Sequence, residues 1–255
     1  MTDVLAPLKP SELAAFYGRL ADGVDRNRGA LKVSVAALLM RHWLENRDSS
    51  STFRFDAPEH LKNRAPVLAV LEFHRKVFLT QEKAQFTGGI RKWAGVIPRL
   101  IGYAPFPKWD TKRPLAMDYE SLVEIPLRYQ LTGDDADRDI LYALRGFQLR
   151  SSVSLTAASL PKGRFTISFQ SFQAEIRDRY DWDYSEHLTV PNPDYGSKMP
   201  GAVAPASKTV VVYHSNAKRL EDAQLAAPYD LQSNPWPVTD AKLLAPTEVE
   251  PTLPK

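Results

Sequence analysis

The chain has 255 residues, 44% of them hydrophobic and 25% charged, so it can bury one large core or two smaller ones. Lysine and arginine (33) exceed aspartate and glutamate (30) by only three, which argues against a nucleic-acid-binding surface. The absence of cysteine excludes disulfides, thiolate metal sites and cysteine nucleophiles. No segment has the pattern of a cleavable signal peptide or of a membrane span, so we expect a soluble chain made in the cytoplasm.

Residues 1–104 are predicted to form a helical N-terminal domain. Ser11 is a candidate cap for a helix over residues 12–25, and residues 31–46 carry apolar side chains at three- and four-residue spacings. Pro58 marks the first turn of a further helix with its own apolar side. We expect this domain to serve in delivery or recognition.

The pattern changes after three prolines in a junction predicted at residues 105–118. Residues 119–242 are predicted to form a β-rich domain, with strands that include 122–131, interrupted by a proline and therefore at an edge, and 209–213. The proline-rich tail, residues 243–255, is predicted to be disordered.

An antiparallel hairpin is predicted from the alternation of apolar and polar residues in 147–157 and again from residue 165 onward. The apolar positions of the second strand switch from odd to even numbers near residues 170–171, which indicates a β-bulge. The predicted fold class is therefore α+β: a helical region followed by a curved antiparallel sheet or half-open barrel.

Four reactive side chains follow at the end of this second strand: Asp178, Tyr180, Asp181 and His187. Asp178 and Tyr180 have the parity of the buried residue Ile176, so the cluster begins where the buried alternation stops, at a sheet rim. Carboxylates and an imidazole at such a rim are suited to acid–base or metal-assisted hydrolysis. The alternative is an ordinary polar strand end, in which the two aspartates cap a turn and pair with Arg177 and Arg179.

The pattern D-x-Y-D-x5-H resembles the catalytic signature of the colicin M family, bacteriocins that cut lipid II between the undecaprenyl chain and the pyrophosphate. A glycine-led strand from Gly163 runs into the motif, which lies in the C-terminal part behind a helical region, as in those toxins. Residues 220–229 and the extension 227–231 loosely match the family's closing segment. The resemblance covers about residues 120–235 and is specific only over 163–187.

The resemblance implies an antibacterial toxin with a Mg²⁺-dependent lipid II hydrolase activity. Asp178 and Asp181 would hold the metal, or one of them would orient His187, which would act as a general base or as the attacking group. Tyr180 would position its neighbours by hydrogen bonding. The implied partners are lipid II, a cognate immunity protein and a secretion apparatus such as type VI, and the implied place of action is the target cell's periplasm at the inner membrane.

One position departs from the family pattern, because Leu188 stands where the family has an arginine after the histidine. The missing cation for the phosphate could come from one of four residues: Arg177, Arg179, Lys198 or Arg219. Otherwise the chain is a catalytically silent relative or a non-enzymatic secretion adaptor. A nuclease with the same carboxylates is a further alternative, against which the near-neutral charge argues.

Other clusters have structural interpretations. The acidic residues Asp134, Asp135, Asp137 and Asp139 lack the glycine and glutamate of a calcium loop and are predicted to begin a helix that ends at Gly146. Three histidines without ligand spacing are interpreted as structural: His42, His60 and His74. His214 would approach His187 if their strands were neighbours. Residues 90–101 are interpreted as a packed segment, with contact to a membrane surface as the alternative.

Overall fold

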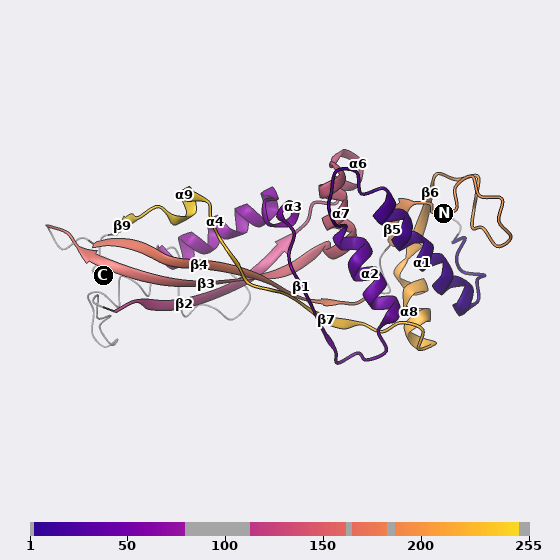
Figure 1. The fold of residues 1–255 in the computed structure, drawn as a ribbon, viewed down its shortest axis with the longest axis horizontal. Helices are drawn as coiled ribbons and strands as arrows, with labels where there is room; N and C mark the ends of the chain where they lie inside the picture. Colours follow the sequence, from indigo (N-terminus) through magenta and orange to yellow (C-terminus); the bar gives the residue numbers. More distant parts are fainter. Residues whose placement is uncertain (1–2, 80–112, 162–164, 183–186, 250–255) are drawn as a thin grey trace, which may run out of the picture. The chain divides into compact units, whose positions relative to one another are not determined.

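A computed structural model of the chain describes residues 3–79, 113–161, 165–182 and 187–249 (Figure 1). The described helices are α1 (Pro10–Arg26), α2 (Val35–Glu45), α3 (Glu59–Lys62), α4 (Ala65–Leu79), α6 (Tyr129–Thr132), α7 (Asp135–Leu144), α8 (His214–Asp222) and α9 (Ala241–Leu244). The described strands are β1 (Thr52–Phe55), β2 (Leu115–Glu124), β3 (Gly146–Ser159), β4 (Phe165–Tyr180), β5 (His187–Pro191), β6 (Thr209–Tyr213), β7 (Tyr229–Ser233), β8 (Trp236–Pro237) and β9 (Thr247–Val249).

These elements confirm the α+β class. Seven described strands form one sheet with the order β1-β7-β4-β3-β2, in which β8 and β9 also pair with β4, while β5 and β6 form a second sheet. The main sheet is mixed, because β1 pairs parallel with β7, whereas β4 pairs antiparallel with β7, β8 and β9. In the described part of the chain the sheet is open, with β1 and β2 at its ends.

The chain divides into two compact units that are not contiguous in sequence. Unit 1 comprises Met1–Arg64, Glu124–Phe147 and Arg177–Ser233, and unit 2 comprises Ala65–Val123, Gln148–Ile176 and Asn234–Lys255. This division differs from the predicted one at residues 1–104 and 119–242. Its physical reason is that the first helices bond to the C-terminal segment: the backbone N–H of Ala227, for example, donates to the carbonyl of Trp43 at 3.3 Å.

Unit 1 holds a helical layer whose ends are capped from within the unit. Helix α1 begins at Pro10 rather than after Ser11, and Ser34 caps α2 by accepting from the backbone N–H of Ala37. The buried carboxylate of Asp139, on α7, accepts from the backbone N–H groups of Val35 and Ala36 at 2.8 and 3.2 Å. A carboxylate at a helix N-terminus stabilises it. The acidic run is thus a structural helix start, as predicted.

Asp134 caps α7 by accepting from the backbone N–H of Asp137 at 2.8 Å. His60 Nε2 lies 3.0 Å from the carboxylate of Asp139, and His42 stacks on Phe53 with ring centroids 4.1 Å apart. Both histidines therefore have structural surroundings, in agreement with the sequence-based interpretation.

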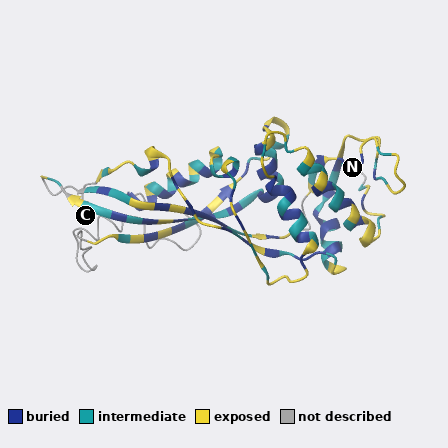
Figure 2. Cartoon of the chain, viewed as in Figure 1, coloured by how far each residue is buried: buried dark blue, intermediate teal, exposed yellow. Residues whose placement is uncertain are grey.

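Unit 2 is built on the long strands β3 and β4; from Phe147 to Leu155 of β3, buried residues alternate with half-buried or exposed ones (Figure 2). The predicted parity switch is confirmed by burial in β4: Ile167 and Phe172 are buried, whereas Gln170 and Ser171 between them are exposed. His74 on α4 is buried against the sheet, and two hydroxyls from β2 and β3 bond its ring, as described below.

The structure corrects the prediction of a disordered tail for residues 243–249, while residues 250–255 lie outside the described part of the chain. Residues 241–244 form α9, and β9 pairs with β4 so that Thr247 lies opposite Ile167. Arg75 fixes this segment by donating to the carbonyl of Leu243 at 3.0 Å and to Thr247 Oγ1 at 2.6 Å. The proline content of this segment gives no indication of its pairing with β4.

The strand expected at residues 122–131 is also corrected. β2 ends at Glu124, ahead of Pro126, and residues 129–132 form α6, because a proline cannot donate to a sheet ladder. Residues 90–101 and most of the predicted junction lie outside the described residues. No helix among the described residues is both long and apolar enough to cross a membrane.

A candidate catalytic site at the end of β4

The motif begins on the core-facing side of β4, inside unit 1. Asp178 lies opposite Leu231 of β7, and Tyr180 lies opposite Tyr229. Tyr180 is buried and stacks on Tyr229 with ring centroids 5.2 Å apart and planes 13° apart. Burial raises the pKa of both phenols. The expected sharing of one face by Asp178 and Tyr180 is therefore confirmed.

The neighbouring arginines belong to the alternate positions of the strand, because successive side chains of a strand point to opposite faces. Arg179 is exposed, and its Nη1 forms an ion pair with Asp230 at 2.7 Å. Arg179 thus pairs with Asp230 of β7, whereas the interpretation of a polar strand end has it pair with an aspartate of the motif.

Asp178 has the most perturbed carboxyl of the motif. Burial raises its pKa to about 7, opposed by a hydrogen bond from the backbone N–H of Arg179 and supported by the nearby charge of Asp181. An acid whose pKa lies near neutrality can both hold and release a proton under physiological conditions. This is the property required of a general acid or base.

Asp181 follows the strand end and is exposed. Its charge acts on Asp178, so two carboxyl groups lie near one another. In the described part of the chain no three side chains of the histidine, aspartate and glutamate types are arranged as a metal cage. Two carboxyl groups are the kind of protein ligands that Mg²⁺ takes together with water and phosphate oxygens.

His187 lies on the second sheet rather than on β4. It is the exposed first residue of β5 and pairs with Tyr213 of β6, their rings 5.5 Å apart. Among the described residues, no hydrogen bond or ion pair joins His187 to Asp178 or Asp181. The structure thus places Asp178 and Tyr180 on β4 with Asp181 directly after them, and places His187, with Leu188, on the second sheet.

The strand that precedes His214 does neighbour that of His187, since β5 and β6 pair, but His214 belongs to the helix that follows β6. His214 itself is buried at the start of α8, with its ring 4.9 Å from that of Trp182 at 88°. His214 thus packs toward the motif segment rather than beside the exposed His187.

The residues that are candidates to bind the substrate phosphate differ in the contacts that their side chains make. Arg219 on α8 donates to the carbonyl of Leu8 and to Asn216 Oδ1 at 3.1 Å, so it ties the N-terminal segment to the unit. It is also close enough to lower the pKa of Tyr17 in part. Lys198 is exposed in the loop between β5 and β6, and Arg177 occupies an alternate position of β4.

Sequence reasoning missed an aromatic cluster around Tyr180. Trp182 contacts four rings, with centroid distances of 5.9 Å to Tyr17, 5.4 Å to Trp43, 6.1 Å to Tyr180 and 4.9 Å to His214. Trp182 lies within the motif segment and could have been singled out there. Tyr17, on α1, is distant in sequence and gave no such signal.

Two polar atoms of this cluster are buried without a hydrogen-bond partner in the described part of the chain: Tyr17 Oη and Trp182 Nε1. Burial is the main cause of a raised pKa of Tyr17, with a further contribution from Tyr180. An unsatisfied buried polar group destabilises a fold, and such groups require a structural or functional reason. Here they border the motif.

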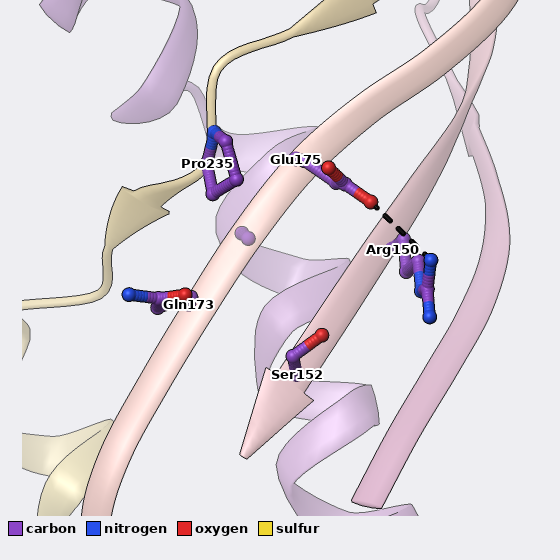
Figure 3. A pocket seen from close by; sticks show the side chains of 6 residues that line it. Arg150, Ser152, Gln173, Glu175 and Pro235 are labelled. Atoms are coloured by element: carbon purple, nitrogen blue, oxygen red, sulfur yellow. Dashed lines mark ion pairs between the residues drawn. The ribbon is translucent and has the colours of Figure 1, made fainter.

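A small pocket in unit 2 offers a contrast (Figure 3). Its lining residues are Arg150, Ser152, Gln173, Ala174, Glu175 and Pro235. Two carboxylates already neutralise the cation, since Arg150 lies 3.0 Å from Asp118 and 3.6 Å from Glu175. This pocket therefore lacks the free charge that a phosphate or carboxylate ligand would require, and no motif residue lines it.

Comparison of the chain with protein-family models, curated proteins and solved structures gave no match. The functional assignment therefore depends on the motif and its geometry.

Proposed function

We propose that this protein is an antibacterial toxin similar to colicin M, which hydrolyses lipid II between undecaprenyl and pyrophosphate and so blocks peptidoglycan synthesis. The observation that carries the proposal is Asp178, a largely buried carboxyl with a pKa of about 7 beside the exposed Asp181. Together with the D-x-Y-D-x5-H spacing, this pair supports a hydrolytic site.

Each motif residue has a role that its surroundings favour. Water attacks the phosphorus next to the lipid, the bond from phosphorus to the lipid oxygen breaks, and the leaving undecaprenol oxygen takes a proton. Asp178, protonated for part of the time at neutral pH, supplies that proton. Exposed His187 accepts the proton of the attacking water, and buried Tyr180 holds the strand end in place against Tyr229.

Mg²⁺ is the cofactor that we propose for this reaction, because it would neutralise the phosphate oxygens. Asp181 is the exposed carboxylate that would ligate it, with Asp178 as a second ligand if its proton leaves. Of the four candidate cations, Arg219 influences Tyr17 and so lies on the motif's side of unit 1. It is our choice for the cation that replaces the family's arginine.

The proposed setting is the periplasm of a target cell, at the inner membrane. The toxin would reach it through a secretion apparatus such as type VI, and the producing cell would hold a cognate immunity protein. A catalytically silent relative or secretion adaptor is the second candidate. It is favoured by Leu188 and by the absence of a bond between His187 and either carboxyl among the described residues.

The test directs the protein to the periplasm of a sensitive bacterium. We expect lysis by the wild type and survival with Asp178→Asn, Asp181→Asn or His187→Gln. Asp222→Asn, which changes an exposed carboxylate on α8, is the matched control and should still lyse the cells. Lysis by Asp181→Asn as fast as by the wild type would contradict the proposal, and DNA degradation by the purified protein would favour a nuclease.

A further inference from the structure

Two segments of unit 1 expose large apolar side chains to an unusual extent. They are the stretch from Leu127 to Leu131, which includes most of α6, and the loop of residues 192–208 between β5 and β6. Leu131 is 87% exposed, Met199 69%, Leu127 55% and Tyr195 53%. In the described part of the chain, these four are the large apolar side chains that are more than half exposed, and all of them lie on these two segments. Such gathering marks an interaction surface.

Both segments are attached to β5, the strand that carries His187. The side chain of Gln130 on α6 donates to the carbonyl of Thr189 in β5. The loop continues directly from the end of β5 into β6. In Figure 1 α6 lies at the top of the picture and the loop between β5 and β6 lies at its right-hand end, and Figure 2 shows exposed residues on both. We call Leu127, Arg128, Leu131, Tyr195, Lys198, Met199 and Lys208 the β5-flanking surface.

Hydrogen bonds within the loop and to α1 hold the loop in one conformation, so its exposed apolar side chains have fixed positions. Asn192 Nδ2 lies within hydrogen-bonding distance of three loop carbonyls, those of Val203, Ala204 and Ser207, at 2.9–3.0 Å. Asp194 is buried, and its two oxygens accept from Nε and Nη2 of Arg19 at 2.7 and 2.9 Å. These bonds therefore fix the backbone of the loop that carries Tyr195 and Met199.

The charges of this surface favour an anionic partner. Arg128, Lys198 and Lys208 are exposed, and none of them has a carboxylate partner among the described residues. Asp194, the acid within the loop, is buried and neutralised by Arg19. Asp134 and Asp135, the exposed carboxylates that follow α6, already pair with Arg64 at 3.0 Å and Arg138 at 2.6 Å, so they do not neutralise these three cations.

We propose that the β5-flanking surface docks unit 1 onto a bilayer rich in anionic phospholipids, with Leu131 and Met199 inserted between the headgroups. Exposed apolar side chains ringed by unpaired cations are the pattern of an interfacial anchor. The purpose of this docking rests on the proposed function, since lipid II resides in a membrane. The docking itself requires no lipid II.

Vesicle sedimentation of the full-length protein tests the proposal. Vesicles of phosphatidylethanolamine and phosphatidylglycerol without lipid II should bind the wild type, and phosphatidylcholine vesicles should bind it at least tenfold more weakly. The variant Lys198→Gln/Lys208→Gln should lose about 25-fold in partitioning, because each cation near such a surface contributes roughly fivefold. Lys32→Gln/Lys242→Gln removes two exposed lysines elsewhere and should bind as the wild type does.

The apolar contribution is tested by Leu131→Ser/Met199→Ser, for which we expect at least a tenfold loss of vesicle binding. Leu122→Ser, at a half-exposed leucine on β2, is the matched control and should bind normally. Unchanged circular dichroism would show that each variant is folded. The absence of wild-type binding to the anionic vesicles, or equal binding by the target and control variants, would overturn the proposal.

Failure of this inference is distinguishable from failure of the proposed function. Lipid II hydrolysis in detergent micelles needs no bilayer, so hydrolysis without vesicle binding would refute the docking surface alone. Vesicle binding without hydrolysis would refute the proposed enzyme and leave the docking surface supported.

Discussion

Asp178 in unit 1 and His74 in unit 2 are both largely buried ionisable groups, but their surroundings differ in kind. The two ring nitrogens of His74 lie 2.6 Å from Ser151 Oγ and 2.7 Å from Ser121 Oγ, so the neutral imidazole is fully bonded. Asp178 has one backbone N–H as partner and a second acid nearby. A buried group with matched partners serves the fold, whereas a partly buried acid beside another acid opposes folding above its pKa and is a candidate for a functional group.

The largest expected effect is on activity at Asp178. Asp178→Asn should reduce lipid II hydrolysis at least 100-fold, because the variant has no proton to exchange, while the fold persists. The same substitution should raise stability at pH 8, where the wild-type carboxyl is charged and buried. Hydrolysis assays check the loss of activity, and urea unfolding at pH 8 checks the gain in stability. An Asp178→Asn variant that is active and less stable than the wild type would contradict the contrast between Asp178 and His74.

The next effect is on stability at His74. His74→Leu should lower the free energy of unfolding by about 2–3 kcal/mol, because two buried hydroxyls lose their partner. Adding Ser121→Ala and Ser151→Ala should restore much of this loss, since the polar groups left unpaired are then removed. If the triple variant were no more stable than His74→Leu, the hydroxyl bonds would not explain the burial of the imidazole.

The pH dependence of stability should have opposite signs for the two groups. Burial lowers the pKa of His74 to about 3 from 6.5, so the unfolded state binds the extra proton and stability falls as the pH drops from 6.5 toward 3. The pKa of Asp178 is raised from 3.8 to about 7, so stability falls as the pH rises through that window. Each group changes the unfolding constant by at most about tenfold per pH unit.

Variants separate these two contributions. Relative to the wild type, Asp178→Asn should gain stability progressively from pH 4 to pH 7, and His74→Leu should lose least at the acid end. Thermal unfolding measured in steps of one pH unit would reveal both trends. A pH-independent difference between Asp178→Asn and the wild type would show that Asp178 titrates normally.

The smallest effect is expected at Tyr17. Tyr17→Phe removes a buried hydroxyl that has no partner among the described residues, so stability should stay equal or rise by up to about 1 kcal/mol. Tyr229→Phe is the matched control, because that hydroxyl donates to the carbonyl of Leu39 at 2.9 Å and its loss should destabilise. Equal destabilisation by both substitutions would mean that the hydroxyl of Tyr17 also has a hydrogen-bond partner.

The sequence allowed prediction of those features that depend on local pattern. Alternation located β3 and β4, the parity switch at Gln170 and Ser171, and the shared face of Asp178 and Tyr180. The acidic run that begins at Asp134 located the start of α7. These predictions succeed because the periodicity of a strand or helix is visible within a few residues of sequence.

Features that depend on distant pairing were missed. The contact of Tyr17 with Trp182 joins residues far apart in sequence, and the pairing of Thr247 with Ile167 ordered a segment whose prolines had suggested disorder. The exposed position of His187 on a separate sheet likewise could not follow from its spacing to Asp181. Tertiary packing, rather than local propensity, decides such placements.

The lipid product of lipid II after incubation with the purified protein and Mg²⁺ tests the central claim most directly. Mass spectrometry should detect undecaprenol free of phosphate from the wild type and from Asp222→Asn, and intact lipid II from Asp178→Asn and Asp181→Asn. Intact lipid II after incubation with the wild type, or a phosphorylated undecaprenyl product, would contradict the account.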